Sequence, residues 1–277
     1  MNNKRATFVN KKAWENDLHW CLNAPALLPH ALPFMVDSTW QQQWQWTLKE
    51  HLPHIAEPQA NSRLGLYFEQ LWRSLIEAHP EWQLLADNVA VQQHGRTQGA
   101  IDFLLVNHQQ QQIEHWELAV KFYLARNASP CASDYLGPNQ QDRLSNKLSK
   151  LLLKQIPLGK HPQIQALAQK YANYSFKQRI VLPGYLFKLG NDSPPTPQNL
   201  HWYSLTQWQA MQAQGWCVLA KQQWLSPNAY SLSKAGSVID VSRGPVQLYL
   251  PEQAKQQEKR IFVCPDDWLT RANNIKS

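Results

Sequence analysis

The sequence has few cysteines and no long apolar run, and each absence excludes a class of protein. The four cysteines are far apart, without the paired spacing of a zinc site, so we interpret them as reduced thiols. Disulfides are the alternative, which the spacing does not support. No stretch approaches the roughly 18 apolar residues of a membrane span, and the first residues lack the apolar core of a signal peptide. We therefore expect a cytoplasmic protein with no membrane partner.

Acidic residues are scarce in one part of the chain. The whole sequence has 27 Lys and Arg and 20 Asp and Glu, a net charge of +7. Between residues 121 and 188, only Asp134 and Asp142 oppose eleven basic residues, an excess larger than that of the whole chain. Positive charge concentrated in this way predicts a polyanionic partner, nucleic acid first. A well-solvated basic surface is the alternative.

Composition and prolines predict the domain organisation. A hydrophobic fraction of 43% and 13 tryptophans indicate a globular protein. The stretch NDSPPTPQN at 191–199 predicts a linker, because its prolines do not fit a regular element. We expect an N-terminal helical extension at 1–60, a core at 61–190 and a Trp-rich C-terminal extension at 200–277.

Ser38 is the expected N-cap of an early helix that ends near His51. Beyond it, residues 61–190 alternate between helical and strand periodicity. The pattern predicts a helix at 63–78, strands at 82–93, 100–106 and 113–124, a helix at 142–156, and strand segments within 178–189. This order of helix, three strands, helix and strand predicts an α/β fold. A helix around 206–214 and strands at 246–250 and 260–264 are expected in the C-terminal part.

Two carboxylates are expected to meet on one face of the predicted sheet. Strand alternation puts Asp102 on the face opposite Ile101 and Phe103. If Val106 pairs with Ile113, Asp102 lies directly opposite Glu117, and a shift of two residues would place it opposite Ala119 on the same face. Opposed carboxylates repel in a purely structural sheet, whereas Mg²⁺, or Mn²⁺ in its place, binds them and leaves room for water and phosphate.

Lys121 shares this face, four residues along the strand from Glu117. An ammonium there would orient a metal-bound water or stabilise charge on a phosphate. A hairpin with a wet polar face is the alternative. The near-continuous apolar neighbours instead favour a strand pair buried on both sides, where a charge without a partner or function is costly.

Residues outside the two strands complete the predicted site. Glu69 falls on an otherwise apolar helical stripe, where it either pairs with Arg63 or Arg73 or points into a site. The helix at 142–156 is expected to contact the phosphate backbone or to present an ordinary solvated basic face. Its basic residues are Arg143, Lys147, Lys150 and Lys154.

The stretches LGLYFEQLW, GAIDFLL and WELAVKFYL resemble the motifs of the PD-(D/E)XK nuclease superfamily over about residues 61–190. The resemblance implies a restriction-endonuclease-like α-β-β-β-α-β core and a Mg²⁺-dependent nuclease that cleaves nucleic acid, with DNA favoured over RNA. Asp102 and Glu117 would bind the metal, Glu69 would assist through a water, and Lys121 would position the nucleophile. A non-catalytic nucleic-acid- or protein-binding module on this scaffold is the alternative.

One position departs from the superfamily pattern. The acidic residue two positions before the lysine is Ala119 here, and the carboxylate stands at Glu117 on the same strand face. The chain also resembles a bacterial family within the superfamily that is catalogued as a domain of unknown function. The stretches that carry this narrower resemblance are LGPNQQDRLSNKL at 136–148, GYLF at 184–187, WLSP at 224–227 and RIFVCPDDW at 260–268.

Overall fold

The computed structural model of the chain divides into two compact units that interleave in sequence. Unit 1 comprises residues 1–120 and 148–183, and unit 2 comprises residues 121–147 and 184–277. The residues that the structure describes are 11–28, 32–48, 63–190, 200–227, 232, 239–251 and 259–273. The expected linker at 191–199 lies outside them. The units differ from the sequence-based partition because strands distant in sequence pair within each unit.

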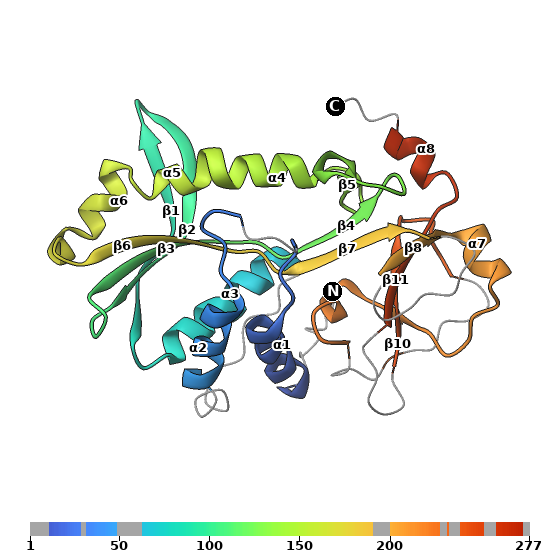
Figure 1. The fold of residues 1–277 in the computed structure, drawn as a ribbon, viewed down its shortest axis with the longest axis horizontal. Helices are drawn as coiled ribbons and strands as arrows, with labels where there is room; N and C mark the ends of the chain where they lie inside the picture. Colours follow the sequence, from blue (N-terminus) through green and yellow to red (C-terminus); the bar gives the residue numbers. More distant parts are fainter. Residues whose placement is uncertain are drawn as a thin grey trace, which may run out of the picture. The chain divides into compact units, whose positions relative to one another are not determined.

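Unit 1 contains a four-stranded mixed sheet in the order β1-β2-β3-β6 (Figure 1). The first three strands pair antiparallel, and β3 pairs with β6 in parallel. The strands are β1 (Trp82–Gln93), β2 (Arg96–Asn107), β3 (Gln112–Leu118) and β6 (Ser175–Val181). The helices are α1 (Lys11–Asn23), α2 (Ser38–Leu48), α3 (Leu64–Ala78), α5 (Ile156–Leu158) and α6 (Pro162–Leu167), with a π-helical turn η3 (Leu151–Gln155) and a 3-10 turn η4 (Gln169–Tyr171).

Helical segments cover both faces of this sheet. On one face, Trp40 and Trp44 of α2 and Trp72 of α3 surround Trp116 of β3, with ring centroids 5.0 to 5.6 Å apart. On the other face, an apolar cluster joins the sheet to α6 and includes Leu104, Val106, Ile113 and Ile164. Every residue of β3 is therefore buried, as the two-sided apolar pattern predicted.

The sequence predicted most elements of unit 1 closely. The helix expected at 63–78 is α3, and the strand expected at 82–93 is β1. The N-cap assignment was wrong, because Ser38 is the first residue of α2 and the amide of Trp40 donates to Asp37 Oδ1 at 2.8 Å. Asp37 therefore caps the helix, since a carboxylate one position before the first turn satisfies an unpaired amide there.

The single strand expected at 113–124 is two strands. Strand β3 ends at Leu118, and β4 (Lys121–Ala125) belongs to the sheet of unit 2. The pairing of β3 with β2 stops at Trp116, and beyond it the amide of Leu118 donates to the Asp102 carboxylate instead of to a strand carbonyl. The apolar run continues through the break, so the alternation pattern gave no sign of it.

Unit 2 contains a seven-stranded mixed sheet in the order β5-β4-β7-β8-β11-β10-β9. Its further strands are β5 (Tyr135–Leu136), β7 (Gly184–Leu189), β8 (His201–Ser204), β9 (Cys217–Leu219), β10 (Val246–Leu250) and β11 (Lys259–Cys264). Its helical segments are η2 (Ala132–Asp134), α7 (Leu205–Ala210), η5 (Lys221–Gln223) and α8 (Trp268–Asn273). Helix α4 (Leu144–Lys150) contains the point at which the chain passes from unit 2 to unit 1.

The two mixed sheets with their helices make this an α/β fold, as the sequence predicted. The four cysteines are free thiols, three of them buried and Cys131 exposed. Among the described residues, none of the helices has the length and hydropathy of a membrane-spanning segment.

Candidate functional site

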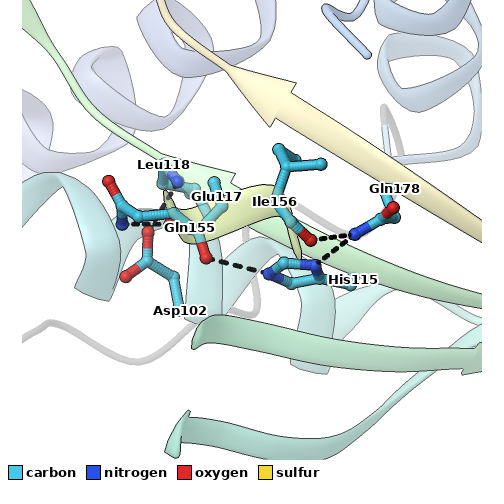
Figure 2. Close-up of polar contacts among 7 residues, drawn as sticks. All are labelled: Asp102, His115, Glu117, Leu118, Gln155, Ile156 and Gln178. Carbon is cyan, nitrogen blue, oxygen red and sulfur yellow. Dashed lines mark hydrogen bonds and ion pairs between the residues drawn. The ribbon is translucent and has the colours of Figure 1, made fainter. Parts of the chain in front are cut away.

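Asp102 and Glu117 lie on the same face of the sheet of unit 1, at the end of the β2-β3 pair. Val106 pairs with Ile113 and Phe103 with Trp116, the first of the two registers considered from the sequence, so the next step brings Asp102 opposite Glu117. The amide of Leu118 donates to Asp102 Oδ2 at 2.7 Å (Figure 2). Asp102 is half-buried and Glu117 is fully buried. The strand end therefore holds two carboxylates side by side.

A donor reaches each oxygen of the Glu117 carboxylate. His115, two residues earlier on the same strand face, lies with Nε2 2.8 Å from Glu117 Oε1. The side-chain amide of Gln155, at the end of the π-helical turn, donates to Glu117 Oε2. Figure 2 shows the carboxylate between these two side chains. The orientation of Glu117 is thus set by residues of β3 and of η3.

The hydrogen-bond partners of His115 define its tautomer. The amide nitrogen of Gln178, on β6, donates to His115 Nδ1 at 3.1 Å and also to the carbonyl oxygen of Ile156. Because Nδ1 accepts, the proton of a neutral ring lies on Nε2, from which it is donated to Glu117. Burial lowers the pKa of His115 to about 4, and the nearby charge of Asp102 partly opposes this shift. The imidazole is therefore neutral near pH 7.

Gly159 permits the helical segment to approach this network closely. A Cβ at position 159 would overlap Nδ1 of His115 and Nε2 of Gln178. The backbone of Gly159 is otherwise ordinary, with a φ of −58°. The glycine is required by space and not by conformation, since any side chain would push η3 and α5 away from the sheet.

Glu69 and Asp102 line one pocket of about 240 Å³ in unit 1. Leu66, Gln70 and Arg73 of α3 and Asp87, Asn88 and Phe103 of the sheet form the rest of its wall. Arg73 pairs with Asp87 and, at 3.6 Å, with Glu77. Glu69 therefore lines a pocket that Asp102 also lines, and both sequence-based alternatives for Glu69 stay open.

Lys121 belongs to unit 2, where it forms an ion pair. Its ammonium lies 2.5 Å from Asp142 Oδ2, and the hydroxyl of Tyr123 donates to the same oxygen at 3.1 Å. Burial, followed by the charge of Asp142, raises the pKa of Tyr123. The structure thus brings Asp102 beside Glu117, and Asp102 and Glu69 line the same pocket. The structure also shows that Asp142 is the ion-pair partner of Lys121. From the sequence, Asp142 was known only as one of the two acidic residues among the basic residues of 121–188.

The predicted basic residues differ in exposure. Lys150 and Lys154 are exposed, and Arg143 and Lys147 are half-buried. The part of unit 1 at 148–183 contains six Lys and Arg and neither Asp nor Glu. Arg179 of this segment is paired with the buried Glu114 of β3. Exposed positive charge therefore accompanies the helices that cover the Glu117 face of the sheet.

A larger pocket of about 470 Å³ in unit 1 lies at the edge of the tryptophan cluster. Trp40, Trp44 and Trp82 contribute to its wall, together with the Glu114–Arg179 pair. The buried Glu114 also accepts from Gln112 and Trp116, so its charge is compensated inside the protein. Within the described part of the chain, no cluster of three or more His, Cys, Asp or Glu suited to a metal ion occurs.

Sequence reasoning missed three members of the Glu117 network, His115, Gln155 and Gln178. His115 was accessible from the pattern, because residues two apart on a strand share a face. Gln155 was not, since a regular helix over 142–156 gives no reason for a π-helical turn. Gln178 depends on the parallel pairing of β6 with β3, which local periodicity does not contain.

The comparisons with known proteins give one family. The family model described as "Domain of unknown function (DUF1853)" matches residues 16–267, which is most of the chain and includes every residue of the network and of the pocket around Asp102. Neither a curated protein nor a solved structure matches the chain.

Proposed function

The chain belongs to the DUF1853 family, and we propose that it is a metal-dependent nuclease whose carboxylate site lies in unit 1. The observation that carries the proposal is the position of Asp102 next to Glu117 at the end of the β2-β3 pair, with Glu69 and Asp102 lining the same pocket. The reaction would be hydrolysis of phosphodiester bonds in nucleic acid, with DNA favoured over RNA.

The topology of unit 1 supports this proposal. A helix precedes three antiparallel strands, and a helical segment then leads to a strand parallel to the third. This order supports the α-β-β-β-α-β core that the resemblance implies. Glu69 lies on the first helix, Asp102 on the second strand and Glu117 on the third, where the PD-(D/E)XK resemblance puts the acidic residues.

The proposal requires a hard divalent cation at the two carboxylates, although the described residues contain no cluster of three or more His, Cys, Asp or Glu suited to a metal ion. Mg²⁺ binds through one or two carboxylates and keeps several waters, and Mn²⁺ accepts similar oxygen ligands. Asp102 and Glu117 would bind the ion, and Glu69 would assist through a water. When bound, the ion would supply an activated water and stabilise charge on the phosphate. Lys121 is proposed to position the nucleophile.

The charge of unit 1 supports a nucleic-acid partner. Lys150 and Lys154 are exposed next to the turn that carries Gln155. No acidic residue occurs between 148 and 183 to oppose them. Phosphate contacts by such lysines hold a duplex without reading its sequence. Together with Lys147 and Arg143, they are the proposed phosphate-binding residues.

A second candidate function is a non-catalytic nucleic-acid- or protein-binding module on the same scaffold. The observation that favours it is the burial of Glu117, whose two oxygens accept from His115 and Gln155. In this function the network would hold the sheet and the helical segment together, and the basic residues would bind the partner.

The deciding experiment measures cleavage and binding by the full chain on single- and double-stranded DNA and RNA, with Mg²⁺ and with Mn²⁺. We expect the nuclease to lose cleavage in Asp102→Asn, because asparagine still accepts from Leu118 but lacks the charge that binds metal. Glu77→Gln, an exposed change on α3, is the control and should keep full activity. Tight binding without any cleavage by the wild type would instead establish the binding module.

A further inference from the structure

We propose that the pocket of about 470 Å³ beside the tryptophan cluster binds an unpaired base of a nucleic-acid strand. This inference rests on the nucleic-acid partner of the proposed function and not on its chemistry. The wall of the pocket contains Glu114 of β3, and strand alternation puts this side chain on the sheet face opposite Glu117. A base bound there would therefore lie away from the proposed cleavage site, and the pocket would contribute to recognition.

Every described residue of the pocket wall belongs to unit 1. These residues come from α2, from the segment that joins α3 to β1, from the turn before β3, and from β3 and β6. The volume of about 470 Å³ lies within the range of roughly 300–1,000 Å³ that is typical of ligand sites. One compact unit therefore forms a pocket large enough for a small planar group.

Tryptophan rings give the pocket a rigid aromatic surface. Trp44 lies nearly parallel to Trp82, with 21° between the ring planes and 6.3 Å between the centroids. Trp40 packs against Trp44 at 5.6 Å, and both rings contact the buried Trp116. Because these rings hold one another in place, little side-chain entropy is lost when a ligand stacks on them. Aromatic side chains are the stacking surfaces that proteins use for unpaired bases.

The charged groups of the wall favour an uncharged ligand. Arg179 donates Nε and Nη2 to the carboxylate of Glu114, so these two charges compensate each other. The ring of His79 is neutral, because its Nδ1 accepts from the amide of Glu81. The carboxylate of Glu81 then leaves the described wall with a net negative charge, which would repel a phosphate. The base is the uncharged part of a nucleotide, and it is the part that fits this pocket.

Polar side chains at the rim supply hydrogen-bonding groups for the edge of a base. Gln42, Gln43 and Gln110 line the pocket and are exposed. An amide side chain both donates and accepts, as the edges of bases do. Lys177 of β6 is exposed and lies opposite Glu114 in the register of β3 and β6, which puts it next to the pocket. Its ammonium would contact the phosphate of the bound nucleotide.

The experiment is a fluorescence-anisotropy titration of the full chain with labelled single-stranded DNA, in EDTA so that no cleavage occurs. Two strands of equal length are compared, one with its bases and one abasic throughout, so that both carry the same phosphates. We expect the wild type to bind the abasic strand about 5- to 150-fold more weakly, which is the factor that stacking of one base contributes. This ratio of affinities is the base preference.

Trp82→Leu removes one stacking surface and should lower the base preference about 5-fold or more. The matched control is Trp208→Leu. Trp208 is a similarly buried tryptophan of unit 2 that packs edge-to-face on Trp216, and its replacement should leave the base preference unchanged. Because each ratio compares two strands on one variant, a partial loss of folded protein cancels.

Exposed positions keep the inference testable if the tryptophan variant does not fold. Replacing Gln43 and Gln110 together with Ala should lower the base preference about 2- to 10-fold for each hydrogen bond lost. The control replaces Gln93 and Gln209 with Ala, two exposed glutamines outside the pocket wall, and should leave it unchanged. Lys177→Gln should weaken both strands by the same factor, and unchanged binding of both would overturn the phosphate contact.

The outcomes separate this inference from the function on which it rests. If the wild type binds neither strand, the nucleic-acid partner is overturned and the inference with it. If it binds both strands equally, only the base pocket is overturned. If Trp82→Leu and the double variant of Gln43 and Gln110 keep the base preference as their controls do, the base binds elsewhere and the inference fails.

Discussion

Gln155 and Ile156 are consecutive in sequence and hold the two ends of one hydrogen-bonded network. The side chain of Gln155 donates to Glu117, and the carbonyl of Ile156 accepts from Gln178, which bonds His115. A π-helical turn ends at Gln155. Such turns widen a helix by one residue and recur at functional sites. At the end of this turn, the side chain of Gln155 and the carbonyl of Ile156 both bond residues of the sheet. We therefore expect the geometry of Glu117 to depend on the π-helical turn staying intact.

The first prediction concerns Gly159, which permits this contact. In Gly159→Ala the new methyl group would overlap His115 and Gln178. Overpacking of this kind costs about 1–3 kcal/mol, so the urea midpoint should fall. Gly65→Ala on α3 is the control, because its Cβ would meet no atom within 4 Å and alanine is the better helix former. A stabilised Gly159→Ala variant would show that the helical segment is not seated closely on the network.

Sequence alone determined much of the sheet in unit 1. The alternation of apolar and polar residues put Asp102 opposite Glu117 on the condition that Val106 pairs with Ile113, and the structure has this pairing. A register error of one residue would have put Asp102 and Glu117 on opposite faces, so the buried face specifies the pairing strongly. Helix α3 was equally accessible, because its apolar stripe continues without interruption from Leu64 to Ile76.

The features of the fold and of the site that the sequence did not predict depend on contacts between residues distant in sequence. The break between Leu118 and Lys121 falls inside an apolar run that favours one long strand, and it is defined by where the partner strands end. The pairing of Lys121 with Asp142 joins residues 21 apart across a loop. The interleaved units follow from parallel pairing of β3 with β6 and of β4 with β7, which leaves no periodic signal in either segment.

The second prediction concerns the opposite face of β3. Glu114 is fully buried and accepts from Arg179 Nε at 2.9 Å and Nη2 at 2.8 Å. Arg179→Met would leave a buried charge without its cationic partner, which should destabilise the protein by about 3 kcal/mol. Arg271→Met breaks the exposed pair with Asp267 and should cost at most about 1 kcal/mol. Equal urea midpoints for the two variants would contradict the buried-pair interpretation.

The third prediction concerns the basic residues of the helical segment. Replacing Lys147, Lys150 and Lys154 together with Gln should weaken nucleic-acid binding and flatten its salt dependence. Each lost phosphate contact reduces the log–log slope by about 0.9 for B-DNA. The measurement is a fluorescence titration at several salt concentrations. The control replaces three exposed basic residues of unit 2 with Gln, namely Lys221, Arg243 and Arg271. This variant has the same net charge and should keep the salt dependence of the wild type. Equal slopes in the two triple variants would show that the basic residues of the helical segment form only a solvated surface.

The last prediction tests whether Lys121 acts in chemistry or only in the ion pair with Asp142. Lys121→Ala should reduce Mg²⁺-dependent cleavage by about 10²–10³ and leave nucleic-acid affinity nearly unchanged. The reason is that an ammonium beside the scissile phosphate acts on charge that grows in the transition state. Asp142→Asn keeps an acceptor for Lys121 and Tyr123 and removes only the charge, so its rate should fall less. Single-turnover rates and binding constants measured for both variants decide the matter. If the two variants lose the same activity in proportion to their loss of stability, the pair is structural, and the nucleophile must be positioned by another residue.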